Sequence, residues 1–205
     1  RALIEAALEF TIANGAEIRR LRAETRTHDR VRAKWPVQWR LDESRCTTFR
    51  LKGYEARYEP SRLGSYMRLR YDRSAPFEKE IPWFDRYVPA TELEAPAGYL
   101  IPQAWGEVVD RMRWNGVELR RVEEPTELEV EAYRVRSYRT LAEPFEGRHL
   151  HDRLELTTER IRVEARPGDW IVPLDQDRAR YVVETLEPLA HDSFFRWGFF
   201  DSVLN

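Results

Sequence analysis

The 205-residue sequence is poor in cysteine, lysine and glycine, with one, three and nine residues of these types. Because Cys46 stands alone, the chain can form neither an internal disulfide nor a CxxC metal site. Cys46 also lacks a neighbouring cationic motif, which favours a buried or inert thiol over a nucleophile. No glycine-rich phosphate loop and no GxSxG nucleophile motif occurs, so the sequence indicates neither type of site.

Long apolar runs and an excess of one charge are also missing. No apolar run approaches the ~20 residues of a membrane-spanning helix, so no membrane span is expected. The 34 basic and 36 acidic side chains give a formal net charge of -2 and are interspersed along the chain. A basic face is therefore not indicated, and we expect no nucleic-acid partner.

The four histidines do not form a metal-hydrolase motif, because HExxH and HxxE are both absent. His149 and His151 would lie on one face if they belong to a strand, which makes them the candidate metal ligands. A tetrahedral site needs further ligands and none is identifiable, so the alternative is an exposed polar loop edge. From these residues we assign no catalytic residue, no metal site and no cofactor to the chain.

The first residues have helical composition, without an initiator methionine, a cap or a signal-peptide pattern. Their apolar side chains occupy adjoining faces of a helix, at Leu3, Ala7 and Phe10 and at Ile4, Leu8 and Ile12. This apolar surface is too broad for a helix in water, so we expect a partner upstream. After residue 15 the pattern thins and predicts a solvated helix that runs into an arginine-rich connector.

From residue 35 onwards the apolar period changes towards two, which is typical of strands. We expect strands over residues 37–41, 48–58, 66–71, 77–83, 117–122, 126–138, 153–156, 160–165 and 169–174. Helices are expected over 103–115, with an apolar stripe of Trp105, Val108, Val109 and Met112, and over 177–186. The predicted fold is α+β and mainly β, an antiparallel sheet or sandwich-like domain with a few helices.

The last stretch of the chain holds five aromatic rings in seven residues, at Phe194, Phe195, Trp197, Phe199 and Phe200. Exposed, they would form an apolar patch of about 750 Å², beyond that of a typical soluble monomer. We therefore expect these rings to pack in this domain or against a neighbour. A helix capped by Asp192 or Ser193 would place Arg196 inside the apolar arc, where Glu146, Glu184 or Glu187 are candidate partners.

Several segments occur in an order that resembles a known family. They are residues 96–105, 109–117, 130–135, 144–149, 168–176 and 186–201. Together they resemble the region that follows the catalytic domain in large bacterial zinc carboxypeptidases of the carboxypeptidase A-like family. The resemblance covers nearly the whole chain and implies that residues 1 to about 21 form the terminal helix of that catalytic domain.

The resemblance implies two parts, residues 1–34 as the terminal helix and connector of an upstream catalytic domain and residues 35–205 as a β-rich accessory domain. The family's zinc ligands and general base lie upstream and have no counterpart here, so the chain alone is expected to be inactive. Its implied partners are the upstream domain of the same polypeptide and, through the parent enzyme, a peptide substrate. Export is compatible with the family, although the sequence defines no compartment.

Two other interpretations stay open at this point. One is an independent β-sandwich module that binds carbohydrate or peptide, which exposed aromatic residues arranged in a groove would favour. The other is an enzyme whose active-site residues are dispersed in the sequence. Aromatic residues buried under the terminal segments would instead favour an accessory domain that supports its neighbour. Arg196 could also reach a carboxylate on the upstream domain.

Overall fold

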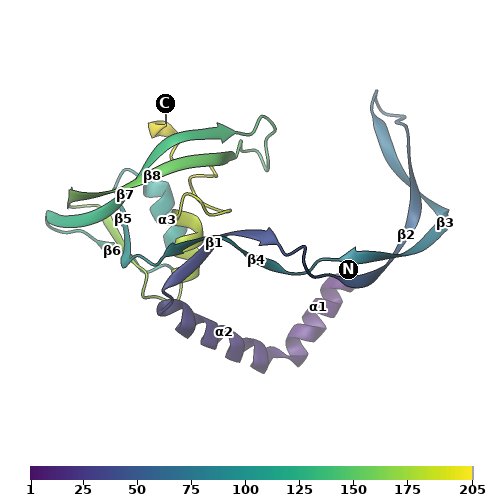
Figure 1. The fold of residues 1–205 in the computed structure, drawn as a ribbon, viewed down its shortest axis with the longest axis horizontal. Coiled ribbons are helices and arrows are strands. Elements are labelled where there is room, and N and C mark those ends of the chain that lie inside the picture. The colour runs from purple at the N-terminus through teal and green to yellow at the C-terminus, as the bar shows by residue number, and fades with distance from the viewer. Residues whose placement is uncertain (205) are drawn as a thin grey trace. The chain divides into compact units, whose positions relative to one another are not determined.

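The structure, a computed structural model, describes residues 1–204 and confirms the predicted α+β class, mainly β with antiparallel sheets (Figure 1). The strands form three antiparallel pairs and one three-stranded sheet, in the orders β1-β4, β2-β3, β7-β8 and β5-β9-β6. Two compact units can be distinguished: Arg1–Gln38 with the chain from Ala90 onwards, and Trp39–Pro89. The predicted division at residue 34 concerns an upstream domain and stays a prediction.

The core of the first unit surrounds the sheet of β5 (Gly98–Ile101), β9 (Trp170–Pro173) and β6 (Arg120–Arg121). Helix α3 (Gly106–Trp114) buries Val108, Val109 and Met112 against it, as the predicted stripe requires. Helix α4 (Ala179–Leu186) adds Val182 and Val183 to this core.

A strand from earlier in the chain completes the core. Strand β1 (Lys34–Leu41), which pairs with β4 (Tyr87–Glu94), contributes Trp35 and Val37. Of the strand predicted over 117–122, only the two residues of β6 form ladder pairs with β9.

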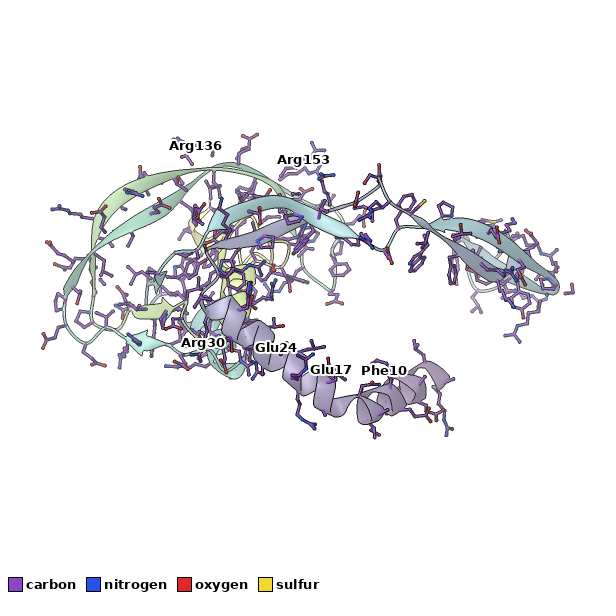
Figure 2. The ribbon with its side chains drawn as sticks, turned by 60° about the horizontal axis from the view of Figure 1, so that its bottom comes forward. Phe10, Glu17, Glu24, Arg30, Arg136 and Arg153 are labelled. Atoms are coloured by element: carbon purple, nitrogen blue, oxygen red, sulfur yellow. The ribbon has the colours of Figure 1, made fainter. Side chains whose placement is uncertain are left out.

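Two helices precede this core, α1 (Ala2–Ala13) and α2 (Gly15–Arg30), and Figure 2 shows Phe10, Glu17, Glu24 and Arg30 in order along them. None of the residues of α1 is buried. The solvated helix predicted to run into an arginine-rich connector continues as far as Arg30. Ion pairs one turn apart, from Arg20 to Glu17 and Glu24, support the solvated helix. At its end, Arg30 donates to Asp177 at 2.9 Å.

The second unit contains a two-stranded ribbon of β2 (Thr47–Pro60) and β3 (Met67–Trp83). β3 is continuous, so the separate strands predicted over residues 66–71 and 77–83 are wrong in having a break between them. The register shifts there by a bulge opposite Tyr54 and Glu55. The Asp72 carboxylate accepts from the Ser74 amide at 3.0 Å and from its hydroxyl at 2.6 Å, so the turn chemistry produces a bulge instead of a strand end.

A second long ribbon, formed by β7 (Thr126–Thr140) and β8 (His151–Ala165), belongs to the first unit. The two short strands predicted within β8 are again one strand, because the ladder to β7 continues through Thr157 and Thr158. Half-buried apolar residues alternate with exposed charged ones along both strands. The ribbon therefore presents one apolar and one charged face.

The aromatic segment after α4 does not form a helix capped by Asp192 or Ser193. It runs through successive turns to a short 3₁₀ helix, η1 (Asp201–Val203). Gly198 has a φ of 72°, a left-handed conformation that interrupts a helix and that glycine adopts without a Cβ penalty. The apolar arc around Arg196, which depended on that helix, therefore does not form.

Candidate functional site

A cavity of about 290 Å³ lies in the first unit, between the ends of the β7–β8 ribbon and the aromatic segment. Its lining comes from three places in the sequence. The ribbon contributes Tyr138, Thr140 and His151, the loop before β8 contributes Arg148 and His149, and the carboxy-terminal segment contributes Trp197, Gly198 and Asp201. The cavity thus combines both candidate histidines with part of the predicted aromatic cluster.

A tight two-residue turn positions the loop side of the cavity. Phe145 and Arg148 exchange backbone hydrogen bonds of 2.8 and 3.0 Å. The intervening Glu146 and Gly147 have φ values of 50° and 80°, as a hairpin turn with two left-handed residues requires. This turn fixes the backbone of Arg148 at the cavity. It also places the centre of the Phe145 ring 6.1 Å from the centre of the Trp197 ring.

His151 is buried and connects three segments. Its Nε2 lies 2.7 Å from Asp201 Oδ1 and its Nδ1 lies 3.0 Å from Thr140 Oγ1. Since a carboxylate only accepts, Nε2 donates to Asp201, and in the neutral ring Nδ1 accepts from the Thr140 hydroxyl. The ring packs against Tyr138 and Phe195, with centroid distances of 4.8 and 5.4 Å. His151 therefore attaches the carboxy-terminal segment to the ribbon.

His149 is exposed and has a different partner, because its Nδ1 lies 2.9 Å from the carbonyl oxygen of Leu141. A carbonyl oxygen only accepts, so Nδ1 donates this hydrogen bond. The structure brings both candidate histidines to one cavity but holds them by separate hydrogen bonds. Within residues 1–204, no three histidine, cysteine or acidic side chains are grouped so as to hold a metal ion.

Arg148 is the cationic side chain of the cavity. Its Nη1 donates to the Trp197 carbonyl oxygen at 3.1 Å, and its guanidinium carbon lies 4.8 Å from the centre of the Phe199 ring. In the described part of the chain, no carboxylate lies within 4.0 Å of this guanidinium. The positive charge is thus held in place by a carbonyl and an aromatic face, not by an opposite charge.

Arg196 lies beside the cavity, and none of its predicted partners pairs with it. Among the described residues, Glu184 pairs with Arg180 and Glu187 accepts from two tyrosines, while Arg196 forms no ion pair within 4.0 Å. The charge of Arg196 nevertheless acts on Asp152, whose pKa is lowered mainly by the hydrogen bond from Arg139 and further by Arg153 and Arg196. The main-chain carbonyl of Arg196 accepts from the His151 amide at 2.8 Å.

A second cluster, which the sequence did not reveal, surrounds Glu187 just after α4. Glu187 is 3% exposed, and its carboxylate accepts hydrogen bonds of 2.6 Å from the hydroxyls of Tyr99 and Tyr133. Burial raises the pKa of Glu187, although both tyrosine hydrogen bonds oppose the shift. Burial and the nearby carboxylate also raise the pKa of both tyrosines. The three residues come from β5, β7 and the end of α4, so their sequence spacing gave no signal.

The aromatic segment contributes mainly to the core. Phe194 and Phe195 are buried, whereas Trp197, Phe199 and Phe200 are half-buried. The Phe200 ring packs edge-on against Trp105 at 4.8 Å, and Phe194 packs against Phe199 at 5.0 Å. Trp197 alone of the five rings lines the cavity.

No protein family, curated protein or solved structure matches the chain. In the part that the structure describes, no helix is both long and apolar enough to cross a membrane. The function is therefore inferred from the residues and their arrangement.

Proposed function

We propose that the chain is the carboxy-terminal accessory portion of a zinc metallocarboxypeptidase, whose upstream catalytic domain hydrolyses C-terminal peptide bonds. One observation carries the proposal: the segments that resemble the family are scattered over about a hundred residues, yet their side chains meet. Ile101, Met112, Val172 and Phe194 come from four of these segments and share one core.

The remaining segments contribute to the two polar clusters. Tyr133, from residues 130–135, donates to Glu187 in the last segment. Arg148 and His149, from residues 144–149, line the cavity together with Trp197. A sequence pattern whose members all meet within one unit supports a resemblance to a folded domain more strongly than scattered short matches would.

The proposed partner of the chain is the upstream catalytic domain of the same polypeptide, which would cover α1. Leu3, Leu8 and Ile12 are exposed on this helix, and isolated helices of this length are marginal in water. The zinc ion and the general base belong to that upstream domain, and no residue of this chain is assigned a catalytic role. The accessory portion supports the catalytic domain or shapes access to its cleft.

The independent binding module is the alternative. Exposed aromatic residues arranged in a groove would favour this alternative, whereas Phe194 and Phe195 of the terminal segment are buried, at 5% and 4% exposure. This burial supports the accessory role.

The experiment compares the longer polypeptide encoded with this chain in its intact form and with residues 35–205 removed. We expect the intact form to release C-terminal amino acids from peptides and the shortened form to lose activity or thermal stability. The isolated 205-residue chain serves as the control and should be inactive. An intact polypeptide without carboxypeptidase activity, when loaded with zinc, would contradict the proposal.

A further inference from the structure

The unpaired guanidinium of Arg148 points to a ligand that the cavity could take. We propose that the cavity binds a small carboxylate ligand with a flat apolar body. The proposal rests on the geometry of the cavity alone and does not depend on the parent enzyme. A volume of about 290 Å³ is near the lower end of the range for small-molecule sites, roughly 300–1,000 Å³.

Arg148 is the group of the lining that can bind an anion, and Asp201 carries the opposite charge. Arg148 carries a full positive charge and, among residues 1–204, meets no carboxylate within 4.0 Å. Asp201 is the acidic residue of the lining, and its Oδ1 is engaged by the protonated Nε2 of His151 at 2.7 Å. Among residues 1–204, Arg148 is therefore the charged residue of the lining that no polar side chain engages.

The guanidinium is also held ready for a planar partner. One of its nitrogens is engaged by the Trp197 carbonyl oxygen, and the Phe199 ring lies against its face. These contacts restrict the side chain and leave other N–H groups free to donate. A guanidinium fork matches the two oxygens of a carboxylate, and a restricted fork loses less entropy when it binds.

The other lining residues favour a flat apolar group beside the carboxylate. Tyr138 and the half-buried Trp197 supply aromatic surface, and Gly198 adds no side chain. Aromatic surface beside a few polar groups is typical of sites for small molecules. Benzoate has both features, a carboxylate and a flat ring, and is the smallest probe that tests them together.

The test is a titration of the whole 205-residue chain with benzoate, followed by two-dimensional NMR of its amides and arginine Nε–H groups. We expect saturable binding in the millimolar range, with the largest shifts at Arg148, His149, His151 and Gly198. Three further probes separate the chemistry: uncharged benzamide, cationic benzylamine and inorganic phosphate should each bind more weakly. Tighter binding of any of these three would overturn the assignment of a carboxylate ligand.

Variants locate the site. Arg148→Gln should weaken benzoate binding about tenfold or more, because hydrogen bonds to charged groups contribute more than neutral ones. Arg136→Gln is the matched control, since Arg136 is an exposed residue of β7 outside the cavity lining (Figure 2), and it should leave the affinity unchanged. Equal affinity in a folded Arg148→Gln variant would overturn the proposal. Absence of benzoate shifts at the cavity residues of the unaltered chain would do so even if the variant fails to fold.

Discussion

The Glu187 carboxylate is the residue whose environment makes the clearest prediction about stability. It is almost fully buried, and burial raises its pKa above the value of 4.5 that it has in the unfolded chain. As the pH rises from below 4.5 through the higher pKa of the folded state, the folded protein holds this proton longer than the unfolded chain. The free energy of unfolding therefore falls with rising pH over this range.

Glu187→Gln should remove this dependence and keep the contacts to both tyrosines, because an amide can accept from one hydroxyl and donate to the other. We expect the stability of the unaltered protein, relative to the variant, to fall as the pH rises from below 4.5 through the raised pKa of Glu187. Urea unfolding at a series of pH values measures the difference. Glu187→Ala is the contrast: it removes the acceptor of the Tyr99 and Tyr133 hydroxyls and should destabilise by about 1–3 kcal/mol. If the unfolding free energies of the unaltered protein and the Gln variant differ by the same amount at every pH, the pKa of Glu187 is not raised in the folded state.

At the scale of elements, α1 is the more apolar helix and α3 the less apolar one, yet only α3 is buried. Leu8 in α1 is 58% exposed, whereas Met112 in α3 is fully buried. Met112→Ala should destabilise by about 2–5 kcal/mol through the cavity that it leaves. Leu8→Ala in the 205-residue chain should stay within about 0.5 kcal/mol of the unaltered protein.

Chemical denaturation of the two variants checks this contrast. In a longer polypeptide that covers α1, Leu8→Ala should instead cost several times more than in the 205-residue chain. A large effect of Leu8→Ala in the 205-residue chain, shown to be monomeric, would mean that another part of it buries this helix.

The sequence predicted elements well where a local pattern determines them. The stripe of α3 and the alternation in β2 and β7 are local, and each of these elements forms within a few residues of the expected range. Strand ends were predicted less well, because Ser74 and its neighbours can form either a turn or a bulge. The period of the aromatic segment is compatible with a helix, but its contacts to Trp105 and His151 determine a path of successive turns.

The cavity could be predicted only in part for the same reason. His149 and His151 were singled out from their spacing, but Thr140 and Asp201 join His151 only through the ladder of β7 with β8 and the return of the carboxy-terminal segment. Tyr99, Tyr133 and Glu187 are far apart in the sequence and carry no recognised motif. Interactions between distant segments are invisible to local periodicity.

At the scale of the whole molecule, the described core of the first unit contains no residue from the second unit, Trp39–Pro89. The first unit should therefore fold without the β2–β3 ribbon. Within the second unit, the Asp42 amide donates to the Arg86 carbonyl at 2.9 Å, so these two residues lie close enough to be joined.

Replacing residues 43–85 by Asn-Gly, which favours a tight hairpin turn, should leave the remaining chain cooperatively folded. We expect the melting temperature to change by less than about 4 °C, the effect of about 1 kcal/mol in a domain of this size. Near-ultraviolet circular dichroism and a thermal scan test this, and loss of the near-ultraviolet signal would show that the ribbon is required for the core.

The proposed function also belongs to the whole molecule, since it requires a second part of the polypeptide. The most direct measurement is the zinc content and carboxypeptidase activity of the complete product of the gene, beside those of the 205-residue chain. The account predicts one zinc ion per polypeptide and activity for the complete product, and neither for residues 1–205. One tightly bound zinc ion in the 205-residue chain, lost when His149 and His151 are replaced by alanine, would contradict it, as would a complete product without zinc or activity.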